Sequence, residues 1–375
     1  MSNMFCTLFS RRPKENLTPA QKRMYALERL DNYRTLARLT ATRSRYTLTS
    51  SDLVSAELQV ELAQLGQFAE LAYAWLDPEF VFANVDVLSR TNFPFEGYDA
   101  LQEATLISSF RGVVADVPAL VIYRGRTRQL VVGFSGTASL RQGLYDVHAN
   151  MKAHPSGPAC AVHSGFWKMY LGCKAQAFEG VRKGLREHEV IELVVTGHSM
   201  GAALAFLFAL DVLTADPPLQ PGLRVKVAAF GSPRFGNEAL SGRWQEIVEA
   251  YMAANGENAV TDYLVKAYND GIPSLPPSIF GYAHLARTAL YFYHGQLFHT
   301  PVSQREHGVF NVAGDALDPA RVPEHPRGGH NYYNGRDWEK IIRRMRWLKQ
   351  VMETGSGEWE KGYISQVAQA ERVRK

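Results

Sequence analysis

The chain has 375 residues, of which 46% are hydrophobic and 21% are charged. This composition excludes a disordered chain, and the length is sufficient for a large buried core without disulfide bonds. The net charge of +4 is small for this length, so nucleic acid is not an expected partner. The three cysteines, Cys6, Cys160 and Cys173, lack the spacing of a zinc site or a disulfide framework, which indicates an intracellular protein with reduced thiols.

The amino-terminal sequence differs from that of a secretory signal. The apolar stretch at residues 4–9 is short and is followed by Arg11, Arg12 and Lys14, whereas a signal peptide needs an apolar run of about 7–15 residues. The longest apolar run, residues 201–210, is about half of the roughly 20 residues that span a bilayer. We therefore expect a cytoplasmic protein without a transmembrane segment.

The first hundred residues are predicted to be a helical extension. Residues 1–20 are polar and are expected to be disordered. Between residues 21 and 39 an apolar side chain recurs every three positions among charges, which predicts one helix. A linker rich in Ser and Thr follows at residues 40–51, and Asp52 is the predicted N-cap of a second helix that reaches Trp75. Both helices are expected to pack outside the main sheet.

The middle of the chain has the pattern of an α/β fold. Three short runs rich in β-forming residues are followed by strands and helices in alternation. Alternation of this kind builds a mostly parallel central sheet with helices on both faces. The predicted strands are residues 105–110, 119–123, 129–134, 190–196, 225–230, 263–267 and 289–293, and the predicted helices are residues 166–187, 200–214 and 238–254.

A last amphipathic helix is predicted at residues 337–352. Its apolar side chains share one face, which fits a terminal helix docked on the domain, with attachment to a membrane surface as the alternative. Basic residues also gather at the amino-terminal end of the chain, so we expect peripheral contact with an anionic membrane or lipid droplet surface. The remaining face of the helix carries Lys340, Arg343, Arg344, Arg346 and Lys349.

The strongest signal for chemistry is the sequence GHSMG at residues 197–201, which matches G-x-S-x-G. It lies between a predicted buried strand and an apolar helix, which is the setting of a nucleophile elbow. The two glycines let the helix pass close to the strand, so that the Ser199 hydroxyl projects into a cleft. The helix start at Met200 offers a backbone N–H to an oxyanion. An ordinary turn between strand and helix is the alternative.

Ser199 needs a histidine base and an acid that orients the histidine. In hydrolases with this elbow the chain order is Ser, acid, His. Asp270 directly follows a predicted strand, and His330 lies in a loop after two glycines, so these two residues complete the predicted triad. His198 is too close to Ser199 in sequence to act as its base, and we expect it to support the packing. The alternative bases are His284, His294, His299, His307 and His325; His163 is predicted to be structural.

Several motifs in the same order resemble the fungal class 3 lipase family, a group of α/β-hydrolases that cleave triacylglycerols and related esters. The resemblance covers about residues 106–333. Its motifs are Phe134-Ser135-Gly136-Thr137, Val162-His163-Ser164-Gly165-Phe166, GHSMG, Phe230-Gly231-Ser232-Pro233-Arg234-Phe235-Gly236-Asn237, and Asp270 leading into Leu275-Pro276-Pro277. The resemblance implies that Ser199 is the nucleophile, Asp270 the acid and His330 the base, with Thr137 and the Met200 backbone as the oxyanion hole.

Residues 138–150 lie where this family has its lid. Leu140, Leu144, Tyr145 and Val147 alternate with polar residues, which predicts a short amphipathic helix. Such a helix would cover an apolar cleft in water and turn its apolar face to lipid at an interface. A fixed surface helix is the alternative.

The chain also departs from the family pattern. Secreted members carry signal peptides and disulfides, which this sequence does not show, so digestion of external fat is not expected. Ser135 stands where many members have an arginine in the oxyanion loop. Residues 300–329 have no assigned role beyond shaping the cleft.

The resemblance implies a serine lipase or carboxylic ester hydrolase that cleaves acylglycerols or related lipid esters through an acyl-enzyme, without a metal or organic cofactor. A phospholipase A1, a non-lipid esterase and a catalytically silent lipase-like scaffold are the alternatives. The expected division is a disordered segment at 1–20, a helical extension at 21–100, an α/β-hydrolase catalytic domain at 101–335, and an amphipathic helix with a tail at 336–375.

Overall fold

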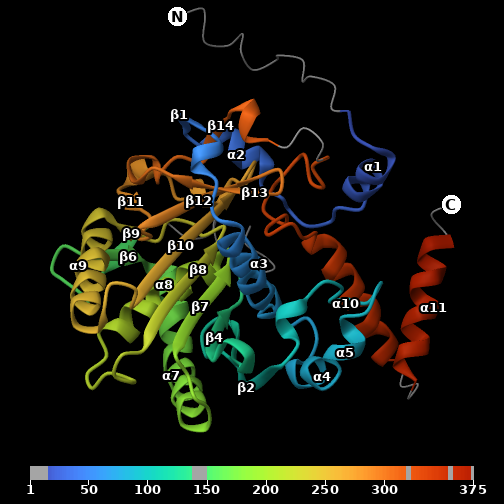
Figure 1. The fold of residues 1–375 in the computed structure, drawn as a ribbon, viewed down its shortest axis with the longest axis horizontal. Coiled ribbons are helices and arrows are strands. Elements are labelled where there is room, and N and C mark those ends of the chain that lie inside the picture. Colours follow the sequence, from blue (N-terminus) through green and yellow to red (C-terminus); the bar gives the residue numbers. More distant parts are fainter. Residues whose placement is uncertain (1–15, 137–149, 318–321, 354–357, 373–375) are drawn as a thin grey trace, which may run out of the picture.

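The computed structural model describes residues 16–136, 150–317, 322–353 and 358–372. Its centre is a sheet of eight strands in the order β13-β12-β10-β8-β7-β4-β3-β2 (Figure 1). The five neighbours from β12 to β4 run parallel, and the strands at both edges are antiparallel to their neighbours. The strands are β2 (Ala104–Arg111), β3 (Pro118–Arg124), β4 (Gln129–Phe134), β7 (Glu192–His198), β8 (Arg224–Phe230), β10 (Val260–Ala267), β12 (Thr288–Tyr293) and β13 (Gln296–Thr300).

Helices cover both faces of this sheet, as predicted. Successive side chains of a strand point to opposite faces, so Val195 of β7 belongs to the core on one face and Val194 to the core on the other. Every residue of β7 is buried, which fits the apolar run from Leu193 to Val195 at its centre. One face is covered by α7 (Ser164–Glu187), α8 (Met200–Leu213) and α9 (Glu238–Asn255), and the other by α3 (Ala56–Leu71), α4 (Pro78–Ala83), α5 (Val85–Leu88) and α10 (Trp338–Glu353).

Smaller elements surround the sheet. β1 (Arg43–Leu48) pairs in parallel with β14 (Val309–Val312), and α11 (Trp359–Arg372) packs on α10. A four-stranded sheet consists of β5 (Met151–Ala153), β6 (Ala161–His163), β9 (Gly236–Asn237) and β11 (Tyr282–Ala283).

The strands and helices predicted between residues 105 and 293 are confirmed, with their ends moved by a few residues. The helix predicted at 337–352 is also confirmed, as α10. In the part of the chain that the structure describes, no helix is both long and apolar enough to cross a membrane.

The predictions for residues 21–75 are wrong in three respects. The single helix at 21–39 is two helices, α1 (Pro19–Ala26) and α2 (Arg34–Thr40), because the segment between them packs on another loop of the protein. Much of the linker at 40–51 is strand β1, which finds its partner more than 250 residues later. Ser55, not Asp52, caps α3, and this helix lies on the central sheet rather than outside it.

The basic face of α10 is only partly solvated. Lys340, Arg346 and Lys349 are exposed, as predicted. Arg344 is buried, and its guanidinium donates to the Phe93 carbonyl at 3.0 Å and to Glu96 at 2.7 Å. Its charge therefore joins the helix to the preceding loops and is not available to a lipid surface.

Candidate active site

Ser199 occupies a sharp turn between β7 and α8. Its backbone has φ of 61° and ψ of −128°, a conformation that non-glycine residues adopt only where the surrounding structure enforces it. The Ser199 N–H donates to the Phe230 carbonyl of β8 at 2.8 Å, which fixes the turn to the neighbouring strand. The strand, turn and helix predicted for a nucleophile elbow are therefore present at this serine.

Two glycines allow this turn. A Cβ atom at Gly197 would overlap the backbone of Gly201, and a Cβ atom at Gly201 would overlap the carbonyl of Phe134 at the end of β4. The start of α8 thus lies against β7 and β4 with no room for a side chain. The sequence predicted this close approach of helix and strand from the two glycines.

Asp270 and His330 meet beside this turn, although 60 residues separate them. The Nδ1 atom of His330 lies 2.8 Å from Oδ2 of Asp270, and both side chains are buried. An ionised carboxylate only accepts hydrogen bonds, so Nδ1 carries the proton and Nε2 of the neutral imidazole is left as the acceptor. This is the arrangement that a base oriented by an acid requires.

Two further donors hold the Asp270 carboxylate. The Tyr333 hydroxyl donates to Oδ2 at 2.6 Å, and the Ile272 N–H donates to Oδ1 at 2.9 Å. The Tyr333 oxygen also accepts the Ala267 N–H of β10 at 3.1 Å. Burial, followed by the Asp270 charge, raises the pKa of Tyr333 well above its usual range, so this hydroxyl remains a donor. Sequence reasoning missed Tyr333, because a tyrosine beside a histidine has no distinctive pattern.

The Ser199 hydroxyl and His330 Nε2 are both buried, and within the described part of the chain neither has a hydrogen-bond partner. Buried polar atoms are nearly always paired, so two unpaired atoms in one site need an explanation. In free enzymes the contact between nucleophile and base is often long and shortens only when substrate binds. The unpaired atoms are the two between which a proton would move.

His198 supports the base rather than acting as one, as expected. Its Nε2–H donates to the His330 carbonyl at 2.9 Å, so its Nδ1 accepts from the Tyr73 hydroxyl at 2.8 Å. Burial, and next the nearby His330, hold the pKa of His198 well below its usual range, so this ring stays neutral. Tyr73 also accepts the Gly136 N–H, which links the predicted oxyanion loop to the histidine loop.

The alternative bases have other contacts. Nε2 of His284 donates to the Pro273 carbonyl at 3.0 Å, and burial lowers the pKa of this ring to about 3. His163 caps α7 by accepting the Phe166 N–H, which agrees with its predicted structural role. His299 is exposed. Among the histidines in the described ranges, His330 is the one in contact with Asp270.

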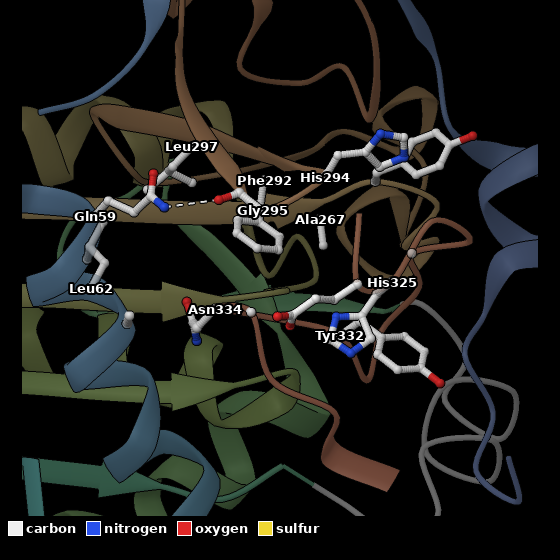
Figure 2. A pocket seen from close by; sticks show the side chains of 15 residues that line it. Gln59, Leu62, Ala267, Phe292, His294, Gly295, Leu297, His325, Tyr332 and Asn334 are labelled. Atoms are coloured by element: carbon white, nitrogen blue, oxygen red, sulfur yellow. Dashed lines mark hydrogen bonds between the residues drawn. The ribbon is translucent and has the colours of Figure 1, made fainter. Parts of the chain in front are cut away.

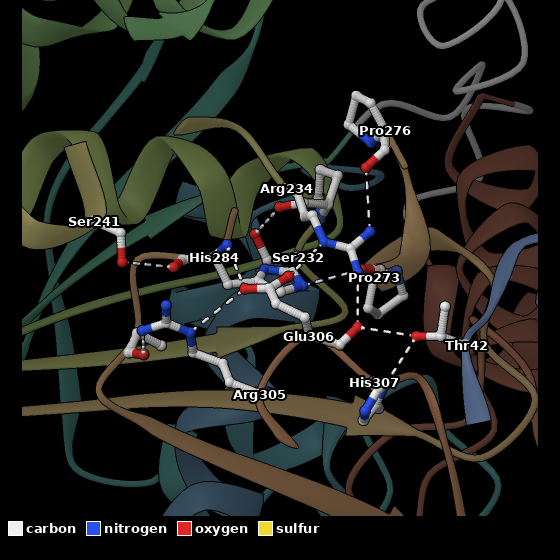
Figure 3. A network of polar contacts seen from close by, with 12 residues as sticks. Thr42, Ser232, Arg234, Ser241, Pro273, Pro276, His284, Arg305, Glu306 and His307 are labelled. Atoms are coloured by element: carbon white, nitrogen blue, oxygen red, sulfur yellow. Dashed lines mark hydrogen bonds and ion pairs between the residues drawn. The ribbon is translucent and has the colours of Figure 1, made fainter. Parts of the chain in front are cut away.

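A buried ion pair holds the loop that follows Asp270. Arg234 donates to Glu306 at 2.5 Å and to the Pro276 carbonyl at 3.1 Å (Figure 3). Burial on its own raises the pKa of Glu306, but nearby His284 and Arg234 lower it to about 2. Residues 300–329, which the sequence left unassigned, therefore supply a carboxylate that anchors the acid loop through Arg234.

A pocket of about 130 Å³ lies beside the loop that carries His330 (Figure 2). His294 and His325, two of the alternative bases, line it together with Tyr332. Burial lowers the pKa of His325 to about 4. Ser199, Asp270 and His330 do not line this pocket, so it is separate from the candidate active site.

Some predicted site residues lie outside the described ranges. These are Thr137 of the expected oxyanion hole and the lid candidates Leu140, Leu144, Tyr145 and Val147. Met200 is described and is the first residue of α8, where backbone N–H groups lack acceptors within the helix. In the described ranges, no three His, Cys, Asp or Glu side chains converge to hold a metal ion.

Comparisons with known proteins find similarity to lipases. A family model described as lipase (class 3) matches residues 131–280. The lipase of Rhizopus oryzae is 25% identical over 201 residues, which are 52% of this chain and 48% of that protein. The secreted mono- and diacylglycerol lipase A of Penicillium camembertii is 28% identical over 176 residues, 46% of this chain and 51% of that protein. The chain thus spans about half the length of the curated relatives that it matches.

Solved structures show the same fold. The triacylglyceride lipase of Rhizomucor miehei aligns with a TM-score of 0.58 at 18% identity, covering 77% of this chain and 98% of that one. The lipase of Rhizopus microsporus var. chinensis aligns with a TM-score of 0.54 at 20% identity, covering 77% and 91%. The fold is that of the α/β-hydrolases, and residues 131–280 of the chain are similar to the lipase (class 3) family.

Proposed function

We propose that this protein hydrolyses carboxylic esters of acylglycerols or related lipids through an acyl-enzyme. One observation carries the proposal: Ser199 occupies the strained elbow, next to a buried Asp270–His330 pair whose Nε2 atom is unpaired. The match of residues 131–280 to the lipase (class 3) model supports the proposal, as do the relatives, which include a mono- and diacylglycerol lipase.

The geometry supports a two-step mechanism. Ser199 Oγ attacks the ester carbonyl while its proton passes to His330 Nε2, and Asp270 stabilises the imidazolium through Nδ1–H. The tetrahedral intermediate then expels the alcohol, which takes the proton from His330. A water molecule, deprotonated by His330, attacks the acyl-enzyme, and the fatty acid leaves as Ser199 regains its proton.

Backbone N–H groups would stabilise the oxyanion of the tetrahedral intermediates. Met200 is one proposed donor, because its N–H lies at the start of α8 directly after Ser199. Thr137 is the second proposed donor, on the basis of the family resemblance. Each donor would lower the barrier by about 3 kcal/mol.

We also propose that the enzyme works at a lipid surface, with residues 138–150 as its lid. Ile279 and Phe280 follow the Asp270 loop and expose 85% and 63% of their surface. An exposed apolar pair favours contact with lipid over contact with bulk water. A flat rate across the critical micelle concentration of the substrate would argue against the lid.

Replacement of the nucleophile tests the proposal. Ser199→Ala should lower kcat on p-nitrophenyl butyrate roughly 10⁴- to 10⁶-fold, since the covalent route is lost. It should also abolish labelling by a fluorophosphonate probe. Ser278→Ala, which changes an exposed serine, is the matched control and should keep both activities. A wild-type rate in Ser199→Ala would refute the assignment, and a folded wild-type protein that is never labelled would favour a silent scaffold.

A substrate panel separates the remaining candidates. We expect hydrolysis of tri-, di- or monoacylglycerols in preference to phospholipids of the same acyl chains. Preference for the sn-1 ester of phospholipids would identify a phospholipase A1. Activity on short soluble esters alone would identify a non-lipid esterase.

A further inference from the structure

We infer that an N-terminal arm, residues 18–34, positions the base His330, and that Asn32 and Arg34 make its principal contacts. The inference rests on the proposed ester hydrolysis and deepens it, because it names what fixes the imidazole in place. The arm lies outside the segment that matches the lipase family model. Its residues act through His330 and are therefore positioning residues rather than members of the triad.

The backbone of His330 is bound from two sides. Its N–H donates to the Asn32 carbonyl at 3.0 Å, and its carbonyl accepts the Nε2–H of His198 at 2.9 Å. Its side chain is bound to Asp270 through Nδ1. Of the polar groups that the structure describes on His330, Nε2 alone has no partner. The arm, the elbow and the acid loop thus each supply one contact that orients this atom.

Residues on both sides of His330 also contact the arm. The Asn331 N–H donates to Oδ1 of Asn32 at 3.1 Å, and the Asn331 side-chain amide donates to the Asp31 carbonyl at 3.2 Å. Arg34 Nε donates to the Gly328 carbonyl at 2.8 Å. Asp31, Asn32 and Arg34 therefore hold backbone and side-chain groups from residue 328 to residue 331.

The arm is itself fixed and can transmit this constraint. Arg34 forms a two-pronged pair with Glu28 at 2.9 and 2.6 Å, and the Tyr332 hydroxyl donates to the same carboxylate at 2.6 Å. At the other end of the arm, Gln21 donates to the Pro323 carbonyl at 2.7 Å and the Tyr25 hydroxyl accepts the Arg327 N–H at 2.8 Å. The arm therefore follows the histidine loop along most of its described length.

Tyr33 places an aromatic ring against the base. The ring centroids of Tyr33 and His330 lie 5.4 Å apart with an interplanar angle of 88°. Tyr33 has φ of 51° and ψ of 20°, a left-handed conformation that a bulky residue adopts only under constraint. The edge-on contact restricts rotation of the imidazole out of the Asp270 contact.

The histidine loop needs such external support. Residues 322–337 contain no helix or strand, so no local ladder of hydrogen bonds fixes them. A displacement of about 1 Å in a catalytic group can lower the rate by about 100-fold. Loss of the arm contacts should therefore lower the rate of the chemical step and leave substrate binding unaffected.

Substitutions in the arm test the inference in the full-length protein. For Asn32→Ala and Arg34→Ala we expect a fall in kcat on p-nitrophenyl butyrate of roughly 10- to 100-fold, with KM within about twofold of wild type. Fluorophosphonate labelling should slow by the same factor. Arg38→Ala is the matched control, since that guanidinium bonds Thr35 on the exposed side of α2, and its kcat should not change. Asn32→Asp keeps the acceptor for the Asn331 N–H and should recover most of the lost kcat, which a general loss of stability would not allow.

The outcomes separate this inference from the proposed function. Unchanged kcat in folded Asn32→Ala and Arg34→Ala, with an active wild type, would overturn the inference alone. Absence of hydrolysis and labelling in both wild type and Arg38→Ala would overturn the proposed function. If an alanine variant fails to fold, Arg34→Gln removes the Gly328 contact with a smaller change in volume, and the same kcat criterion applies.

Discussion

The turn that carries Ser199 and the loop that carries His330 are held in different ways. The backbone of Ser199 is set chiefly by neighbours in sequence, namely β7, two glycines and α8, and one hydrogen bond to Phe230 of β8 holds the turn in place. His330 is fixed by residues about 300 positions away in the arm and 132 positions away at His198. A constraint carried by adjacent residues is visible as a motif, whereas one carried by distant residues is visible only in the fold.

Asp270 combines both kinds of support. It follows β10 directly, so its place at the end of a parallel strand is a local property. Its carboxylate is oriented by Tyr333, and its loop is anchored by Arg234 and Glu306, which are distant in sequence. The acid is therefore easier to predict than the base and harder than the nucleophile.

The largest expected effect comes from a substitution in the turn that carries Ser199. Gly201→Ala would place a Cβ atom against the Phe134 carbonyl. The clash is with backbone, so a side-chain rotation cannot relieve it. We expect a loss of more than about 3 kcal/mol in the free energy of unfolding, at the upper end of overpacking effects, together with the loss of esterase activity. Urea unfolding and hydrolysis of p-nitrophenyl butyrate measure both.

Gly242→Ala is the control for this variant. Gly242 lies in α9, with no atom within 4 Å of the position of an added Cβ. Alanine there should stabilise the protein by up to about 1 kcal/mol, because it is the better helix former. Equal stability of Gly201→Ala and wild type would remove the argument that the elbow is fixed locally.

An intermediate effect on stability is expected at low pH, where the distant residues that anchor the Asp270 loop include the carboxylate of Glu306. The pKa of Glu306 is about 2 in the folded protein and 4.5 as a free side chain, because nearby His284 and Arg234 outweigh burial. A carboxylate with a lowered pKa stabilises the fold above the unfolded pKa. We therefore expect roughly 2–3 kcal/mol to be lost as the pH falls from about 4.5 to 2.

Urea titrations between pH 7 and pH 2.5 check this dependence. Glu306→Gln should be less stable at pH 7 and should show a flatter decline in acid. Glu246→Gln, which alters an exposed pair with Arg243, should follow the wild-type curve. If the stability of Glu306→Gln declined with falling pH as steeply as that of wild type, this carboxylate would be excluded as the anchor of the acid loop.

The smallest of these effects concerns one hydroxyl. Tyr333→Phe removes a donor to Asp270 and leaves the Ala267 N–H without its acceptor. We expect a loss of about 1–2 kcal/mol in stability and a fall of about tenfold in kcat. Tyr46→Phe, which changes an exposed hydroxyl bonded to Asp52, is the control and should differ little from wild type. A kcat unchanged in Tyr333→Phe would show that Asp270 needs only the His330 contact.

The same division explains what the sequence could predict. The strands and helices between residues 105 and 293 have strong periodicities of their own and were predicted closely. The helix predicted at 21–39 is interrupted because Asn32 and Tyr33 satisfy contacts with His330, which the apolar spacing does not signal. Strand β1 was missed because its partner is β14, and an edge pair with polar residues has little apolar alternation.

The site follows the same rule. Ser199 and its glycines were predictable from the motif, and Asp270 from its place after a strand. Tyr73 and Tyr333, which hold His198 and Asp270, have no motif, because tyrosine hydroxyls reach their partners only through the folded chain. Glu306 was missed for the same reason, within a segment rich in glycine, proline and charge.

The pairing of β1 with β14 has a practical consequence for expression of this protein. A fragment that begins after residue 48 would lack β1 and leave the β14 backbone as an open edge. Open edges of this kind recruit other chains and promote aggregation. A recombinant product trimmed in this way would be expected to collect in inclusion bodies, so a clone for an activity screen needs to include β1.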